Sequence, residues 1–292
     1  MSLIQSLPCY LNGEFSTLDK CSISVMDRGF IFGDGIYEVV PVYAGRPFRL
    51  ASHLSRLARS LREVRIENPL TDTQWRAVVE ELVSRHLNMT DKPAATLNQL
   101  IYIQVTRGVA MRDHVMPEGI APTVFAMVNP LKDIPDSHVT AGVRCITAED
   151  FRWEKAHIKS TSLLGAVLSR QMSADVGALE TIMFRNGKLS EAAASNVWVV
   201  KDGKVSGPPK DNLVLEGIRY AIIEELCQAE GIPFSLEEID RSAVLSADEL
   251  MISSATKGIL PVIELDDHVV GAGKPGPIFQ RLLTRYQLEK LK

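Results

Sequence analysis

One break in the periodic patterns constrains the fold of this chain more than any other sequence feature. The segment VNPLKDIPDSHV, residues 128–139, contains two prolines and several polar side chains, and it follows neither a helical nor a strand period. A chain of 292 residues, 46% of them hydrophobic, is long enough to bury two cores. We therefore predict an N-terminal domain over residues 1–129, a linker over 130–137 and a C-terminal domain over 138–292.

Both halves of the chain mix strand patterns with helical patterns. Apolar alternation predicts a strand over residues 37–43, in which Pro41 indicates an edge position or a bulge. Further strands are expected in CYLNGEF, LIYIQVTRG, ETIMF and NVWVV. The turn RNGK lies between ETIMF and NVWVV, and the turn KDGK follows NVWVV. Helices are expected over residues 54–64 with Ser52 as cap, 73–87, 217–230 and 277–291. The pattern indicates an α/β or α+β protein of two domains that meet in a cleft.

Lys159 lies directly before three candidate capping residues in AHIKSTSLLGAVL. Leucine and valine follow at helical spacing over residues 163–168, which predicts an amphipathic helix that begins after Ser162. A cation at a helix N-terminus faces the positive end of the helix dipole. Either the side chain extends into water, or the dipole and partial burial keep the amine neutral and nucleophilic. The segment alone leaves both interpretations open.

Three further motifs are weak alone and stronger together. Glu191 precedes three alanines, whose small side chains let a flat group approach the backbone. The helix expected to begin at Gly217 and the hydroxyl-rich turn in ISSATKG both offer backbone amides to an anion. Each motif also has a plain structural explanation, as a tight hairpin, a helix start or a turn. Together, a lysine, a carboxylate and two anion-binding segments are the groups expected of a site for pyridoxal 5'-phosphate (PLP).

Composition excludes several classes of function. A formal net charge of -4 gives no general attraction to nucleic acid or to an anionic membrane surface. No apolar stretch approaches the roughly 20 residues of a membrane span, and no signal peptide is visible. The four cysteines form no C-x-x-C pattern, so reduced thiols and a cytoplasmic location are expected. The six histidines show no ligand spacing, and we expect no metal site.

Five stretches resemble the class IV (fold type IV) PLP-dependent aminotransferases, and among these the D-amino acid aminotransferases most. They are DRGFIFGDGIYEV, TRGVAMRDH, FRWEKAHIKSTSLLG, SEAAASNV and SSATKGILPV. The resemblance runs along nearly the whole chain in the same order. It implies a small N-terminal α/β domain, a larger C-terminal domain shaped like a pseudo-barrel, and a homodimer that holds the cofactor between the domains.

The resemblance also assigns cofactor residues position by position. Lys159 matches the Schiff-base lysine, Glu191 the partner of the pyridine nitrogen, and Arg56 the arginine that grips the phosphate. Leu215 matches the residue packed on the ring. Ile218 and Arg219 match the amides at the helix start, and Ala255 with Thr256 matches the second phosphate contact. The chain departs from the family in having Ala255 where a phosphate-binding threonine is usual, and alanine in place of glycine after Glu191.

Substrate choice follows from three other positions. Tyr37, Arg112 and His114 match the residues with which D-amino acid enzymes trap the substrate α-carboxylate, Arg112 and His114 reaching in from the other subunit. An arginine with a flanking histidine and tyrosine supplies charged and neutral donors to one carboxylate. We therefore expect amino transfer from a D-amino acid to a 2-oxo acid such as 2-oxoglutarate or pyruvate, by a ping-pong mechanism.

Alternative activities remain on the same fold. They are 4-amino-4-deoxychorismate lyase, (R)-amine transaminase and branched-chain aminotransferase, which generally differ in the R-x-H pair or in the FGDGIYEV segment. From another class, GAGKPG at residues 271–276 matches the G-x-G-x-x-G dinucleotide motif. Too few residues follow this motif to complete a βαβ unit, so we interpret it as a chance match.

Overall fold

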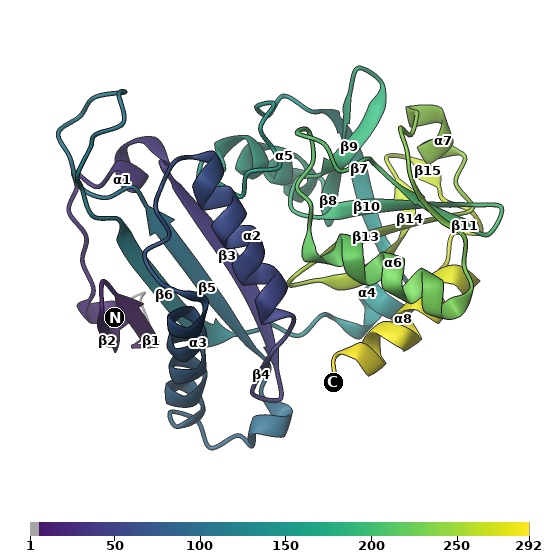
Figure 1. Cartoon of the computed structure of the whole chain (residues 1–292). Coiled ribbons are helices and arrows are strands. Elements are labelled where there is room, and N and C mark those ends of the chain that lie inside the picture. The colour runs from purple at the N-terminus through teal and green to yellow at the C-terminus, as the bar shows by residue number, and fades with distance from the viewer. Residues whose placement is uncertain (1–5, 292) are drawn as a thin grey trace. The chain divides into compact units, whose positions relative to one another are not determined.

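The computed structural model describes residues 6–291 and divides into two compact units (Figure 1). Unit 1 comprises Met1–Lys132 and Ile158–Leu163, and unit 2 comprises Asp133–His157 and Leu164–Lys292. The short segment that contains Lys159 therefore belongs with the N-terminal part of the chain, although it follows the expected linker in sequence. The domain limits given above stay a prediction.

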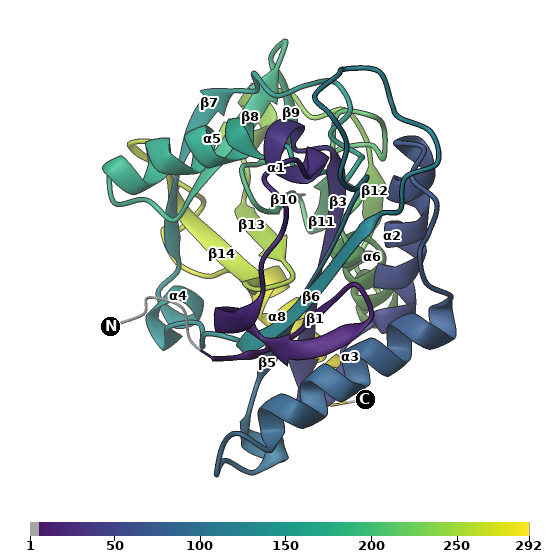
Figure 2. The ribbon, with the colours of Figure 1, turned by 90° about the vertical axis from the view of Figure 1, so that its left-hand side faces the viewer.

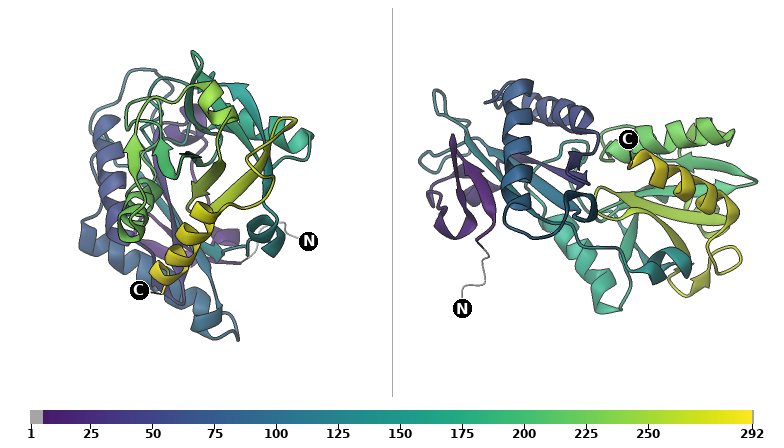
Figure 3. Two further views of the ribbon diagram at one scale, coloured as in Figure 1. Left: turned by 90° about the vertical axis from the view of Figure 1, so that its right-hand side faces the viewer. Right: turned by 90° about the horizontal axis from the view of Figure 1, so that it is seen from below.

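Unit 1 is built on a six-stranded antiparallel sheet with the order β2-β1-β6-β5-β3-β4. Its strands are β1 (Pro8–Leu11), β2 (Glu14–Thr17), β3 (Gly35–Tyr43), β4 (Arg46–Pro47), β5 (Gln99–Thr106) and β6 (Thr123–Pro130). Its helices are η1 (Leu18–Lys20), α1 (Arg28–Phe32), α2 (Leu50–Glu63), α3 (Asp72–Leu87) and η2 (Ala94–Thr96). The long helices α2 and α3 lie on one face of the sheet (Figures 2 and 3).

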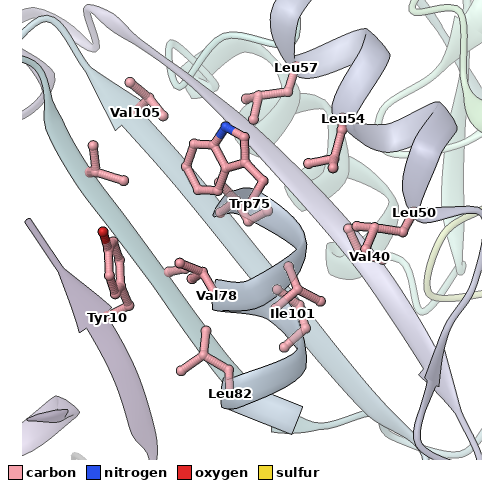
Figure 4. Close-up of a cluster of buried hydrophobic side chains, with 14 of the residues drawn as sticks. Tyr10, Val40, Leu50, Leu54, Leu57, Trp75, Val78, Leu82, Ile101 and Val105 are labelled. Carbon is pink, nitrogen blue, oxygen red and sulfur yellow. The ribbon is translucent and has the colours of Figure 1, made fainter. Parts of the chain in front are cut away.

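The apolar stripes of these two helices form the core of unit 1. Leu54, Leu57 and Trp75 are at most 1% exposed and pack toward β3 and β5 (Figure 4). Burial of each such side chain stabilises the fold by about 1.5–3 kcal/mol. A capping box between Thr71 and Gln74 starts α3. The expected cap Ser52 is wrong, because the N-cap residue of α2 is Arg49, three residues earlier, which has a left-handed backbone conformation with φ 54°.

Strand β3 follows the predicted alternation and carries the site residues of unit 1. Ile36 and Val40 are fully buried, while Tyr37 is half-buried on the other face. All its residues from Gly35 to Val42 pair with β5. Among the described residues, the opposite edge is paired only at its ends, by β4 and by an isolated bridge between Ile36 and Ser160. The predicted edge position or bulge is wrong, because β3 lies between β5 and the two-residue β4, and its pairing with β5 runs without a register shift. Pro41 is tolerated because it faces the short β4 side, where its carbonyl accepts from the Phe48 amide at 2.8 Å and no amide proton is needed.

Unit 2 contains a nine-stranded mixed sheet with the order β12-β11-β10-β13-β14-β7-β8-β9, and β15 pairs with β14. The strands are β7 (Val143–Glu149), β8 (Glu180–Arg185), β9 (Lys188–Ala192), β10 (Asn196–Lys201), β11 (Lys204–Gly207), β12 (Phe234–Leu236), β13 (Glu249–Ser254), β14 (Gly258–Leu265) and β15 (His268–Val269). The helices are α4 (Asp136–Thr140), α5 (Leu164–Asp175), α6 (Ile218–Glu230), α7 (Arg241–Leu245) and α8 (Pro277–Glu289). Strand β9 is the last strand of this order, yet an isolated bridge between Ala192 and Ser195 links it to the start of β10, which is the third strand. The sheet therefore curls, as expected for a pseudo-barrel.

Local sequence determines the turns and ends of this sheet. Asn186–Gly187 and Asp202–Gly203 both have positive φ and close the two predicted hairpins. The glycines of GAGKPG lead into α8, where the Glu249 carboxylate accepts from the amides of Ile278 and Phe279. The helix start that a dinucleotide phosphate would need is thus already capped. This geometry supports the interpretation of the motif as chance.

Helix α5 differs from its prediction in two respects. It begins at Leu164, and its apolar face is exposed: Leu164 is 72% exposed and Val167 is 58% exposed. The buried side chains are the small Ser169 and Ser173. The spacing of apolar residues indicated a helix correctly. It did not indicate that no other part of the described chain would cover its apolar face.

Candidate functional site

Lys159 lies in extended backbone alongside β3, five residues before α5. Its carbonyl accepts from the Tyr37 amide at 3.0 Å, and the Thr161 amide donates to Gly35 at 2.9 Å. Its half-buried side chain places Nζ 4.2 Å from the centroid of the Tyr37 ring. The expected position at a helix N-terminus is wrong, and with it the dipole argument, because the dipole acts only within the first turn. The backbone of β3, rather than a helix end, positions this amine over an aromatic face.

Arg56 is only 5% exposed on α2, whereas Arg59, Arg62 and Arg65 of the same region are more accessible. Its Nε and Nη2 donate to the two carboxylate oxygens of Glu38 at 2.6 and 2.8 Å. His53 Nδ1 lies 2.8 Å from the same carboxylate. Burial disfavours the charged carboxylate, but Arg56 and His53 outweigh it and hold the pKa of Glu38 well below its ordinary value. Glu38, which sequence reasoning missed, therefore holds Arg56 in a fixed orientation.

Arg112 and His114 lie in the exposed loop between β5 and β6. The Phe32 ring of α1 contacts both, with centroid distances of 5.4 Å to the Arg112 guanidinium and 5.4 Å to the His114 ring. Arg28 supports the loop, since its Nη1 donates to the carbonyl of Asp113 at 2.5 Å. Within residues 6–291, no hydrogen bond or ring contact joins Tyr37 to this pair. The chain thus presents Arg112 and His114 outward on a supported loop.

Glu191 at the end of β9 is a buried carboxylate surrounded by donors. Arg152 Nη1 donates to its Oε1 at 2.8 Å, and the amide of Leu215 and the side-chain amide of Asn196 donate to its Oε2 at 3.2 and 3.3 Å. Burial raises the pKa of Glu191 above its ordinary value, and Arg152 offsets this effect only in part. Asp150 in turn binds Arg152 through two oxygens at 2.9 Å. Arg152 was visible within FRWEKAHIKS, but no local pattern paired it with a residue 39 positions away.

Leu215 and Gly217 form the entry to α6. The Asn196 side chain donates to the carbonyl of Leu215 at 3.0 Å. A Cβ at Gly217 would lie 2.1 Å from Asn196 Oδ1, so only glycine fits there. The helix begins at Ile218, one residue after the predicted start at Gly217, and Gly217 as its N-cap residue makes no side-chain hydrogen bond to the first turn. Its first amides are therefore suited to bind an anion.

The turn that contains Ala255 and Thr256 joins β13 to β14. Arg219, the second residue of α6, donates from its guanidinium to the carbonyls of Ser254 and Ala255 at 3.2 and 3.4 Å. Arg219 therefore ties this turn to the start of α6 with its side chain, a role beyond the backbone amide assigned from the resemblance. Thr256 is exposed, and its hydroxyl lies 3.4 Å from that of Ser254.

Lys257 ties the same turn to the strands on its other side. Its Nζ donates to Glu180 Oε2 at 2.7 Å and contacts Ser195 Oγ at 3.1 Å, and Ser195 donates to the same Glu180 oxygen. Glu180 is fully buried on β8. One polar network thus joins the turn to the segment between Glu191 and Asn196. Sequence reasoning missed this network because Lys257 lies 77 residues from Glu180 and 62 from Ser195.

The candidate residues fall into two sets. Unit 1 holds the Lys159 amine, Arg56 bound to Glu38, and the exposed loop with Arg112 and His114. Unit 2 holds the Glu191 carboxylate, the start of α6 and the turn that Arg219 and Lys257 anchor. These groups fit PLP: an amine for its aldehyde carbon, a carboxylate for its ring nitrogen, and amides for its phosphate. Among the described residues, no cluster of three or more histidine, cysteine or acidic side chains can hold a metal ion. None of the described helices is long and apolar enough to cross a membrane.

Comparison with known proteins gives matches along nearly the whole chain. Residues 35–265 match the family described as Amino-transferase class IV. The D-alanine aminotransferase of Bacillus licheniformis is 34% identical over 280 residues, covering 94% of this chain and 94% of that protein. The D-alanine aminotransferase of Staphylococcus aureus (strain COL) is 36% identical over 283 residues, covering 95% and 96%.

Solved structures share the fold. A branched-chain amino acid aminotransferase from Escherichia coli matches with a TM-score of 0.85 at 23% identity, covering 97% of this chain and 94% of that chain. The branched-chain aminotransferase from Thermoproteus uzoniensis with norvaline matches with a TM-score of 0.85 at 23% identity and the same coverage. A further branched-chain amino acid aminotransferase, solved with pyridoxamine 5'-phosphate, has a TM-score of 0.88 at 22% identity. The predicted fold, mixed α and β with a curled C-terminal sheet, is confirmed.

Proposed function

The chain belongs to the class IV aminotransferases, and we propose that it transfers the amino group of a D-amino acid to a 2-oxo acid with PLP as cofactor. The substrate class is supported by the D-alanine aminotransferases, which are 34% and 36% identical over 94% and 95% of this chain. The structural observation that carries the proposal is the Lys159 amine, fixed by β3 with Nζ 4.2 Å from the Tyr37 ring centroid. Such an amine can bind an aldehyde and then move a proton.

Lys159 and Glu191 are the groups to which we assign the chemistry. When bound, PLP supplies an electron-withdrawing ring that stabilises negative charge on the substrate Cα. Lys159 would hold the cofactor through Nζ, and the same amine, when free, would take the α-proton of the substrate on Nζ and return it. The Glu191 carboxylate would accept from the N–H of the cofactor ring and would keep that proton in place. Its Arg152 partner favours the charged carboxylate and so opposes the effect of burial.

The remaining candidates hold the cofactor. We assign Arg56, Ile218, Arg219, Ala255 and Thr256 to the phosphate and Leu215 to the face of the ring. For Ala255 only the backbone amide is available, since its side chain carries no hydroxyl. The Glu38, Lys257 and Glu180 contacts give these groups a fixed geometry before binding, which lowers the entropy lost on binding.

Tyr37, Arg112 and His114 are assigned to the substrate α-carboxylate, with Arg112 and His114 supplied by a second subunit. The outward position of their loop supports this proposal. The exposed face of α5 supports a homodimer, because Leu164, Val167 and Leu168 are each more than half exposed. A cytoplasmic location is also proposed, supported by four free cysteines in a chain of this class.

A panel of half-reactions tests the activity. The purified holoenzyme is mixed separately with D-alanine, L-alanine, (R)-phenylethylamine and aminodeoxychorismate, and the cofactor absorbance is followed. The proposal expects rapid conversion by D-alanine and restoration of the starting spectrum by 2-oxoglutarate or pyruvate. Faster conversion by (R)-phenylethylamine or by L-alanine, or pyruvate release from aminodeoxychorismate, would assign one of the alternative activities.

Arg152→Met should move the acidic limb of the kcat/KM profile to higher pH. Loss of the guanidinium removes the charge that favours the Glu191 carboxylate, so the pKa of Glu191 rises further and the active form is lost at a higher pH. Loss of one charged hydrogen bond costs about 1.5–3 kcal/mol, so we expect a decrease of about ten- to a hundredfold at about pH 6 and a smaller one at about pH 9. Arg144→Met is the control, because Arg144 is an exposed arginine of the same unit that pairs with Glu264 rather than with Glu191. A uniform decrease at every pH would contradict this role.

Lys257→Met should weaken cofactor binding by about tenfold, as the turn loses its anchor of about 1.5–3 kcal/mol. Titration of the apoenzyme with PLP measures the dissociation constant. The double variant Lys257→Met/Glu180→Gln removes the uncompensated buried charge, so it should recover thermal stability while cofactor binding stays weak. Lys201→Met, which removes an exposed ion pair to Asp248, is the control. Recovery of cofactor affinity in the double variant would show that Lys257 acts only through stability.

Leu168→Glu should dissociate the proposed dimer, because a charge would then lie in the buried apolar interface formed by α5. Analytical ultracentrifugation at micromolar protein measures the effect as a shift to the monomer mass. Val269→Glu on β15 replaces a side chain that is 66% exposed, and it should leave the dimer intact. A monomeric wild-type enzyme, or a dimer unaffected by Leu168→Glu, would rule out this interface.

A further inference from the structure

Two cysteines that are separated in sequence meet in unit 1. Cys9 lies on β1, where it pairs with Ser16 of β2 and Met127 of β6, and its side chain is fully buried. Cys21 ends η1, and its side chain is half-buried. The two sulfur atoms are 3.0 Å apart. A disulfide bond measures about 2.05 Å, so the sulfurs need to approach by only about 1 Å to bond.

The two thiols differ in access. Burial, and the hydrogen bond with Cys21, raise the pKa of Cys9 to about 12, so Cys9 is a protonated thiol at neutral pH. A thiolate is the reactive species, and access to an oxidant requires exposure. Cys21 is the one with partial exposure, which makes it the group that an oxidant meets first. Cys145 and Cys227 are buried, and no other cysteine lies against them in the described part of the chain.

The pair lies in a segment that leads to the Arg112 loop. Residues 9–21 contain the β1–β2 hairpin and η1, and residues 22–25 are exposed. Figure 2 shows this purple segment leading from the hairpin to α1. At its end, the carbonyl of Met26 accepts from the amide of Ala110, and Asp27 forms a bridge with Val109. The segment that begins at Cys21 therefore ends against the loop that carries Arg112.

We propose that Cys9 and Cys21 form an oxidation site, at which a small-molecule disulfide converts the two thiols into one intramolecular disulfide bond. The Cys21 thiolate attacks the disulfide R–S–S–R, which breaks the S–S bond, forms Cys21–S–S–R and releases one thiolate. Cys9 then attacks the Cys21 sulfur, and its proton passes to the second departing thiolate. The protein loses two electrons and two protons, and R–S–S–R becomes two molecules of R–SH. This site is independent of the proposed transaminase activity.

The expected consequence is a more stable unit 1. A cross-link between residues 9 and 21 restricts the unfolded chain, while the folded geometry needs little change. We expect the midpoint of thermal unfolding to rise by about 5 °C on oxidation, and to return on reduction.

The test equilibrates the holoenzyme in glutathione buffers that range from fully reduced to fully oxidised. The protein is then unfolded in denaturant that contains N-ethylmaleimide, so that buried free thiols are also blocked, and peptides are mapped by mass spectrometry without reduction. The proposal expects a cross-linked Cys9–Cys21 peptide that grows with the oxidised fraction, together with the higher unfolding midpoint. Cys145→Ser and Cys227→Ser should keep both results, and Cys21→Ser should abolish both. Cys21→Ala replaces Cys21→Ser if the serine variant folds poorly.

Three outcomes would overturn the proposal. Complete labelling of Cys9 and Cys21 by N-ethylmaleimide, after equilibration in oxidised glutathione, would show that no disulfide bond forms. A glutathione adduct that persists on wild-type Cys21 would show that Cys9 does not attack it. An equal rise of the unfolding midpoint in Cys21→Ser would show that the stabilisation comes from elsewhere. Cys9→Ser, in contrast, should stop at the glutathione adduct on Cys21, which supports the order of attack.

Discussion

Replacement of Lys159 by alanine should lower the rate of D-alanine transamination by about 10²–10⁴-fold. The variant loses the only amine that β3 holds over the Tyr37 ring among the described residues, and with it both covalent attachment and proton transfer at Nζ. Single-turnover mixing of PLP-loaded variant with D-alanine measures the chemical step directly. Added methylamine should restore part of the rate, because a free amine can take over the proton transfer.

Borohydride trapping locates the attachment independently of activity. Reduction of the resting holoenzyme followed by peptide mapping should place the pyridoxyl group on Lys159. Lys155→Ala is the matched control, since Lys155 is an exposed lysine of the same segment, and this variant should retain label and activity. Label on another lysine, or a Lys159→Ala variant with unchanged single-turnover rate, would refute the assignment.

Arg112→Ala should lower kcat/KM for D-alanine by about ten- to a hundredfold, with the cofactor spectrum unchanged. Each hydrogen bond to a charged group contributes about 1.5–3 kcal/mol to binding, and a bidentate pair of hydrogen bonds to the carboxylate contributes more. Arg112 contacts the Phe32 face and is exposed, so its removal leaves no cavity and should cost little stability. Both half-reactions are measured, since the 2-oxo acid presents the same carboxylate.

(R)-phenylethylamine supplies the internal control for this variant, because it lacks a carboxylate. Its conversion, however slow in the wild type, should stay the same or improve in Arg112→Ala. Arg112→Lys keeps the charge without the planar pair of donors and should lie between wild type and alanine. Equal losses on both substrates would mean that Arg112 supports the loop or the dimer. An unchanged kcat/KM for D-alanine would show that Arg112 does not bind the substrate carboxylate, and it would favour one of the alternative activities.

Much of the secondary structure could be predicted from periodicity and from turn residues. The Leu54, Leu57 and Leu61 stripe indicated α2, and the pairs Asn186–Gly187 and Asp202–Gly203 indicated the two hairpins. These signals are local, since they depend on neighbours within one or two turns of chain. The family could be identified for a related reason: its motifs are short stretches whose order survives in the sequence.

The environment of each candidate group was decided by tertiary structure. Lys159 was expected at a helix start, but it lies beside β3 and the ring of Tyr37, far away in the chain. Glu191 depends on Arg152, and Arg56 depends on Glu38, through ion pairs that no spacing rule connects. Side-chain orientation and burial are set by such distant contacts, and burial in turn sets the pKa of a carboxyl group.

The sequence by itself determined where the long helices and the two hairpins form, which residues of those helices are apolar, and which family's motifs the chain carries. It did not determine which apolar face is covered: the apolar stripe of α2 is buried in unit 1, while the leucines and valine of α5 are exposed. Nor did it bring Cys9 to Cys21, whose sulfurs meet only because β1 and the end of η1 fold together. The periodicity of apolar residues shows that one face of an element packs best against an apolar neighbour. It does not show which neighbour, because contacts between residues distant in sequence leave no local pattern.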